Sequence, residues 1–283
     1  MKRLIVTGDD FGLARPVNEA IEEAHRSGIL TTASLMVSAA AAQDAVERAR
    51  KLPSLRVGLH LVLVEGRPVL PPERVPDLVD GNGEFSDRLA RAGIRYFFLP
   101  GVRRQLESEI RAQFNAFRRT GLPLDHVNAH NHMHLHPTIL DLTLKVGSGH
   151  GLRAVRLPYE PPLGSWHATR TALVSKLATG IFLFPWTARM RSRLRRARLH
   201  FNDRVFGLFD SGCMSAERTI QILRRLPEGV SEIYFHPATS RCPEIERLMP
   251  CYRHEEEFAA LTSPAVKLAV EKLGVQRIAF SDL

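Results

Sequence analysis

Aspartate and histidine side chains stand where several short apolar runs of this sequence end. Asp9 and Asp10 follow the first such run, His60 lies toward the end of another, and His236 ends a third. Apolar runs of this length are typical of buried strands. Because the active sites of α/β proteins lie at the carboxyl ends of parallel strands, these four side chains are candidate catalytic groups.

A cluster of histidines is the strongest chemical signal in the chain. Five of the 12 histidines lie in the segment from His126 to His136, and this excess favours a binding function over scattered core histidines. Alternate residues of an extended chain point to the same side, so His130, His132 and His134 are predicted to share one face. Two imidazoles placed in this way can bind one metal ion.

The adjacent aspartates Asp9 and Asp10 are suited to two separate tasks. Neighbouring side chains of a strand point in different directions, so one carboxylate can bind a cation while the other stays free as a base. Repulsion between the two would raise the pKa of one of them unless a cation lies nearby. The plainer alternative is a cap before the following helix.

One carboxylate and two imidazoles form a metal site with open coordination positions. Such a metal lowers the pKa of water and polarises a carbonyl, while a nearby carboxylate can take up the proton. The residues therefore predict metal-assisted hydrolysis of an amide or ester. His60 is compatible with a metal ligand or a core residue, and His236, before Pro237, with a ligand, a general acid or a turn residue.

The elements that must position these groups alternate along the chain of 283 residues. Alternating strands and helices predict a parallel sheet, and six or seven such units favour a distorted or incomplete (β/α) barrel over a Rossmann sheet. No GxGxxG, GxSxG or Walker motif is present, which argues against dinucleotide binding, serine hydrolysis and P-loop chemistry. We expect strands at 3–7, 31–38, 55–63, 126–130, 153–158, 231–236 and 275–280, helices at 16–28, 42–52, 102–120, 138–151 and 255–274, and little regular structure at 65–100.

Composition indicates a globular protein of the cytoplasm. Apolar residues make up 44% and charged residues 24% of the chain, which is ordinary for soluble domains. No apolar run reaches the 18 residues of a spanning helix, and the carboxylates after the first strand do not suit a secretory signal. Cys213, Cys242 and Cys251 form no CxxC pair, so a disulfide framework is not expected.

The net charge of +9 is concentrated in one segment. Residues 161–202 contain no Asp or Glu but eight Lys or Arg, six of them arginines within 189–198, directly after the apolar stretch 177–186. An apolar patch beside an Arg-rich stretch is typical of contact with an anionic membrane surface, here through 177–198. A solvated basic helix is the alternative. Nucleic acid is not expected, because no recognisable binding fold accompanies the charge.

Five ordered motifs, TGDDFGL, GLHLVL, NAHNHMH, YFHP and YRHEEEFAAL, resemble the YdjC-like carbohydrate deacetylases, which include chitooligosaccharide deacetylases. The resemblance spans 1–283 and is weakest in the middle. It implies one domain with a basic and apolar insert at about 161–202, and a distorted βα barrel related to polysaccharide deacetylases. The implied reaction removes an acetyl group from an N-acetylated sugar with one divalent metal (zinc, nickel, cobalt, manganese or magnesium).

The same resemblance implies roles for the candidate residues. Asp10, His60 and His130 would bind the metal, Asp9 would be the general base, and His236 would be the general acid.

Three further residues receive supporting roles from the resemblance. His132 and His134 would line the sugar pocket or hold the site from behind. Asn128 stands where the family often has Asp, two positions before the first histidine of the run, and is expected to orient the site.

The basic segment resembles that of the hopanoid-biosynthesis-associated branch of the family, which implies a lipid-linked N-acetylglucosamine as substrate and a position at the inner face of the membrane. Three alternatives stay open: a chitooligosaccharide deacetylase, a metal phosphoesterase, and a non-catalytic carbohydrate-binding protein. The second would need more carboxylates than one Asp pair, and the third would not need Asp9. The sequence does not choose between a monomer and a homodimer.

Overall fold

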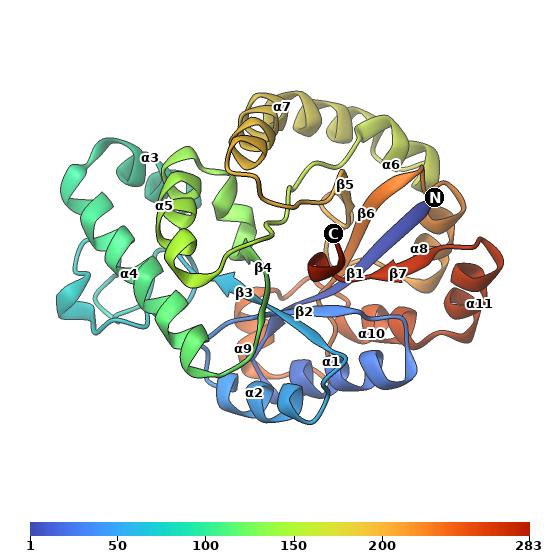
Figure 1. Cartoon of the computed structure of the whole chain (residues 1–283), viewed down its shortest axis with the longest axis horizontal. Helices are drawn as coiled ribbons and strands as arrows, with labels where there is room; N and C mark the ends of the chain where they lie inside the picture. Colours follow the sequence, from blue (N-terminus) through green and yellow to red (C-terminus); the bar gives the residue numbers. More distant parts are fainter.

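Seven parallel strands form the centre of the computed structural model, which describes residues 1–283 (Figure 1). Their order across the sheet is β4-β3-β2-β1-β6-β5, and β7 pairs with β1. Because every pair is parallel, the carboxyl ends of all strands meet at one edge. The strands are β1 (Lys2–Phe11), β2 (Thr32–Leu35), β3 (Arg56–Leu61), β4 (Leu124–Ala129), β5 (Arg204–Phe206), β6 (Gly229–Phe235) and β7 (Gln276–Ile278).

An irregular segment, residues 153–159, joins the two ends of this curled sheet. Single bridges link Val155 to Val127 of β4 and Ala154 to His200, and the N–H of Val205 in β5 donates to the carbonyl of Tyr159. The prediction of a strand at 153–158 was wrong, because this segment contacts two different partners one residue at a time. The prediction of a distorted, incomplete barrel is confirmed.

Helices surround the sheet (Figure 1). The first of them shows why: Val17, Ala20, Ile21 and Ala24 lie on one face at helical spacing and are all buried, so burial of that face stabilises the helix. The helices are α1 (Arg15–Ser27), α2 (Ala42–Arg50), α3 (Leu89–Phe98), α4 (Pro100–Arg119), α5 (Pro137–Gly147), α6 (Pro162–Thr169), α7 (Leu173–Arg196), α8 (Ala216–Arg224), α9 (Pro243–Leu248), α10 (His254–Thr262) and α11 (Pro264–Lys272).

Several helices differ from the sequence prediction, which did not include α3, α6, α8 or α9. Residues 65–88 have little regular structure, as expected, but α3 follows them even though it contains Gly93. Tertiary contacts compensate for that glycine, since the buried Tyr96 donates a hydrogen bond from its hydroxyl to the carbonyl of Leu63 at 2.7 Å. The region 255–274 forms two helices, because Pro264 starts a new one.

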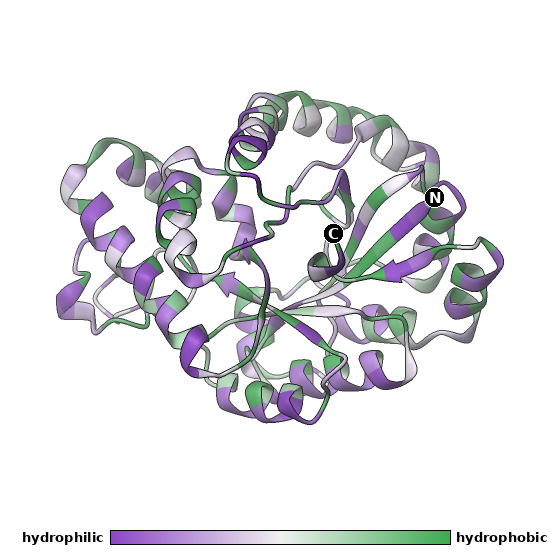
Figure 2. Cartoon of the chain, viewed as in Figure 1, coloured by the Kyte–Doolittle hydropathy of each residue, from purple (hydrophilic) through white to green (hydrophobic).

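The long helix α7 lies along the outside of the barrel and carries both hydrophobic and hydrophilic residues along its length (Figure 2). Its few buried side chains include Lys176, which forms an ion pair with Asp210 at 3.0 Å. Ile181, Phe182 and Phe184, in contrast, are exposed. Neither α7 nor any other helix of the structure is long and apolar enough to cross a membrane.

Candidate metal centre and active-site cavity

The end of β1 directs two neighbouring carboxylates to different partners. The pairing between β1 and β2 is irregular between Gly8 and Phe11, and Asp10 has a φ of 61°. Aspartate tolerates this left-handed conformation better than most residues. The irregularity turns Asp10 toward His60 of β3 and His130, which directly follows β4, whereas Asp9 contacts Arg156.

Asp10, His60 and His130 form a buried cluster at the carboxyl edge of the sheet. One carboxylate oxygen of Asp10 lies 3.2 Å from Nε2 of His60 and 3.2 Å from Nδ1 of His130. One possible ligand atom from each residue lies within 4.8 Å of the other two. Asp10 lies near the end of β1, His60 near the end of β3, and His130 directly after β4, so one edge of the parallel sheet brings together residues that are far apart in the sequence.

The hydrogen bonds of His60 show that this cluster fits a cation. Its Nδ1 lies 2.7 Å from Oδ1 of Asn128, whose amide nitrogen donates to Asp9 and Ser34. Nδ1 must therefore carry the proton, and Nε2 of a neutral ring presents a lone pair to an oxygen of Asp10. Two acceptors at 3.2 Å repel unless a proton or a metal ion lies between them. Imidazole and carboxylate donors suit zinc and related divalent metals.

His130 also lies between two carboxylates. Burial by itself would lower its pKa, but Asp10 and Glu65 together raise it to about 10. The other carboxylate oxygen of Asp10 and Nε2 of His130 are buried without hydrogen-bond partners. The site is thus arranged to hold a positive charge.

Only the first histidine of the run belongs to this cluster. The prediction that His130, His132 and His134 share one face of a strand was wrong, because residues 130–135 form a tight turn in which Asn131 and His132 have φ values of 51° and 52°. His132 lies 3.0 Å from the hydroxyl of Tyr234 and lines the cavity above the cluster. His134 is buried behind the cavity, where its ring contacts a backbone carbonyl.

An arginine that the sequence reasoning missed holds Asp9 in place. Arg156, fully buried, donates to both carboxylate oxygens of Asp9 at 2.5 and 3.0 Å and to Glu232 at 2.7 and 2.9 Å. Burial opposes ionisation of Asp9, but Arg156 and His60 lower the pKa of Asp9 far below its usual value. An arginine between Val155 and Leu157 was the available signal, since a cation in an apolar run must find a partner.

A chain of buried polar groups supports the cluster from below. Asn128 accepts from His60 and donates to Asp9, and therefore fixes both side chains. It also donates to Ser34, whose hydroxyl lies 3.0 Å from His126. Because Asn128 is fully buried and does not line the cavity, its position suits orienting the site. Gly58 leaves space for the His126 ring, which a Cβ at that position would overlap.

His236 lies across the cavity at the end of β6. Its imidazole packs between the rings of Tyr234 and Tyr252. Its backbone is held by the motif at the start of α10, where His254 contacts the carbonyl and Glu257 accepts from the N–H. Burial lowers the pKa of His236 to about 4.

These groups surround a cavity of about 380 Å³ above the metal cluster. Six of the side chains that line it carry the candidate chemistry: Asp9, His60, His130, His132, Tyr234 and His236. Leu208 forms part of another wall, and its N–H donates to the buried carboxylate of Glu160 at 2.8 Å. The cavity can therefore hold a small polar substrate within reach of both a carboxylate and an imidazole.

Glu160 makes the stability of the protein depend on pH. Burial raises its pKa from 4.5 to about 7, so the folded state favours the protonated acid, and this stabilisation is lost as the pH rises from about 4.5 through 7. We expect Glu160→Gln, which keeps an acceptor for the loop, to raise the free energy of unfolding by about 1–3 kcal/mol at pH 8 and much less at pH 5. Urea unfolding at both pH values measures this, with the exposed Glu228→Gln as control. An equal change at both pH values would contradict it.

Comparison with known proteins finds relatives that match nearly the whole chain. The family model described as YdjC-like protein matches residues 3–272. A carbohydrate deacetylase of Geobacillus stearothermophilus is 31% identical over 98% of this chain and 96% of its own. A chitooligosaccharide deacetylase of Yersinia enterocolitica is 30% identical over 99% of both chains. A crystal structure from Enterococcus faecalis, described as a candidate cellobiose-phosphate cleavage protein, superposes with a TM-score of 0.77 at 27% identity, covering 99% of this chain and 98% of its own.

Proposed function

Because the chain belongs to the family of YdjC-like proteins, we propose that it is a divalent-metal-dependent hydrolase that removes the N-acetyl group from an N-acetylated sugar. The observation that carries the proposal is the buried Asp10, His60 and His130 cluster beneath a cavity that Asp9 and His236 also line. A divalent ion held there would polarise the amide carbonyl and lower the pKa of water.

The protein's own groups then divide the proton transfers. Asp9, kept ionised by Arg156, accepts a proton from the attacking water. Its lowered pKa makes Asp9 a weak base, so this transfer would depend on a metal ion that acidifies the water and on the fixed position of the carboxylate. Arg156 and Asn128 together hold the carboxylate in that orientation.

His236 is the group we place at the leaving nitrogen. Breaking the C–N bond of the amide requires a proton on the departing amine. His236 would donate this proton as an imidazolium ion, a charge state that the carboxylates of Asp9 and Asp10 favour and burial opposes. His132 and Tyr234, joined at 3.0 Å, are placed to contact the sugar.

For the substrate we propose a lipid-linked N-acetylglucosamine, of the kind used in hopanoid biosynthesis. The support is the apolar and basic character of α7 and the residues that follow it, where Arg195, Arg196 and Arg198 are exposed. Part of the basic run serves the fold instead, since Arg189 and Arg193 form ion pairs with Asp141. A chitooligosaccharide substrate is the second candidate, because a relative of similar length is named for that activity.

The decisive experiment measures acetate released by the purified protein after metal removal and reloading with single divalent metals. N-acetylglucosaminyl hopanoid in detergent and the N-acetylglucosamine dimer serve as substrates. Metal-dependent acetate from the lipid substrate alone supports the full proposal, and acetate from the dimer alone leaves the deacetylase and removes the lipid. No acetate from either, with metal bound, contradicts the proposed function and favours a carbohydrate-binding protein.

Membrane contact through 177–198 has its own test. We expect the protein to sediment with vesicles rich in anionic lipid, and Ile181→Glu to weaken this binding because it places a charge on an exposed apolar position of α7. Leu268→Glu, at an exposed leucine of α11, is the control. Equal sedimentation of all three proteins would contradict the contact.

A further inference from the structure

A second cavity, of about 600 Å³, lies beside the catalytic one and differs from it in chemistry. No carboxylate, lysine or arginine lines it. Its only ionisable lining residues are His132 and His136. A cavity with so few hydrogen-bonding groups suits an apolar ligand and would leave the hydroxyls of a sugar without partners.

The two cavities adjoin at one turn of the chain. Leu89 and His132 line both of them. Within the turn His130–Leu135, the first residue belongs to the metal cluster, whereas Met133 forms part of the apolar cavity. The two cavities therefore share a wall at His132, next to which a group attached to a sugar in the catalytic cavity would lie.

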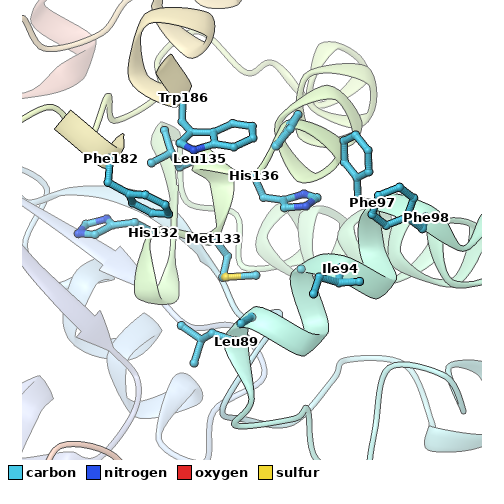
Figure 3. A pocket seen from close by; sticks show the side chains of 13 residues that line it. Leu89, Ile94, Phe97, Phe98, His132, Met133, Leu135, His136, Phe182 and Trp186 are labelled. Carbon is cyan, nitrogen blue, oxygen red and sulfur yellow. The ribbon is translucent and has the colours of Figure 1, made fainter. Parts of the chain in front are cut away.

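Exposed apolar side chains of α3 and α7 form two walls of this second cavity. Figure 3 shows Phe182 and Trp186 of α7 across from Ile94 and Phe98 of α3, with Met133 between them. The exposed fractions are 71% for Phe182, 62% for Ile94 and 68% for Phe98. Large apolar side chains gathered in this way on a surface indicate a site for a ligand or partner.

We infer that this second cavity binds the apolar aglycone of the N-acetylated substrate while the sugar occupies the catalytic cavity. The inference rests on the proposed deacetylase function and assigns the substrate an amphiphilic class. The shared wall at His132 and Leu89 favours an aglycone over a separate membrane lipid, because the occupant is then joined to the sugar. The absence of Lys and Arg from the cavity lining also argues against a phospholipid, because its anionic head group would need a cationic partner.

Synthetic glycosides that stay monomeric in solution test the inference. The probes are the methyl and octyl β-glycosides of N-acetylglucosamine, both below the micelle-forming concentration. We expect kcat/KM for acetate release to be about tenfold or more higher for the octyl glycoside, because its chain leaves water on binding. Equal values for the two glycosides would overturn the inference and leave the deacetylase itself standing.

Two neighbouring residues of α7 provide the matched pair of variants. Phe182 lines the cavity, whereas Ile181 is as exposed but does not line it. Phe182→Glu should bring the octyl-to-methyl ratio of kcat/KM close to one, and Ile181→Glu should keep the ratio of the unmodified protein. Circular dichroism checks the fold of both. If the octyl-to-methyl ratio fell to about one in both variants, the inference would be overturned. The octyl chain would then be attracted to the exposed apolar residues of α7 in general and not to the cavity.

A binding measurement separates this inference from the proposed function. Trp186 lines the cavity, and the chain has only one other tryptophan, Trp166. In a Trp166→Phe protein, the octyl glycoside should change the fluorescence of Trp186 saturably, and the methyl glycoside should not. If neither glycoside is deacetylated, this signal still supports the apolar site, and its absence overturns the site even in an active enzyme.

Discussion

Asp10→Asn is expected to abolish both metal binding and acetate release. Asp10 supplies the only carboxylate of the cluster and contacts both His60 and His130 at 3.2 Å. The amide is neutral and a poor metal ligand, so the two imidazoles would hold a divalent ion weakly. Metal per chain, measured by elemental analysis after dialysis, should fall from about one to near zero, and activity should fall to the level of the metal-free protein.

The choice of asparagine separates loss of the ligand from loss of the fold. The backbone at Asp10 is left-handed, with a φ of 61°, and asparagine tolerates this conformation as aspartate does. His130→Ala removes a second ligand without that constraint and should give the same two losses. The exposed Asp87→Asn serves as the control. Full metal content in Asp10→Asn or His130→Ala would contradict the assignment of this cluster.

Asp9→Asn should have the opposite combination of effects, with metal retained and rate lost. Asp9 contacts Arg156 and Asn128 and makes no contact with the two histidine ligands. Asparagine keeps an acceptor for Arg156 but cannot take up a proton from water. We expect kcat/KM to fall by about 10²–10⁴-fold, as on removal of a general base. Acetate release and elemental analysis on the same sample measure both quantities.

Glu232→Gln is the matched control for Asp9→Asn. Glu232 is the other carboxylate bound by Arg156, is fully buried and does not line the cavity. If Asp9 mattered only as a partner of Arg156, the two variants would lose similar amounts of activity. We expect Glu232→Gln to stay within about tenfold of the unmodified protein. Full activity of Asp9→Asn would contradict the role of Asp9 as the base.

Most residues of the candidate metal centre could be predicted from the sequence, because the patterns that identify them are local. Asp9 and Asp10 after an apolar strand, and His60 and His236 near the ends of others, place polar groups at one edge of any parallel sheet. The same periodicity predicted the incomplete barrel, which the structure confirms. The five motifs predicted the family, which the match over residues 3–272 confirms.

Tertiary structure decided which of these groups act together. The sequence predicts an extended run of histidines, but residues 130–135 form a turn. In this turn His130 joins the metal cluster, His132 lines the cavity and His134 is buried behind the cavity. Such a turn depends on contacts far away in the chain, such as the hydrogen bond of 2.6 Å from Asn131 to Glu65. Local periodicity contains no information about these contacts.

The partners of Arg156 and the second cavity could not be predicted from the sequence for the same reason. Arg156 matters because folding brings Asp9 and Glu232, from β1 and β6, to its two sides. The second cavity exists because α3 and α7, distant in sequence, face each other beside the turn at His130–Leu135. The sequence thus determined which side chains stand at the strand ends, through periodicity and spacing. Only the tertiary structure decided their partners, because burial and electrostatic pairing depend on distances between segments that the chain order does not specify.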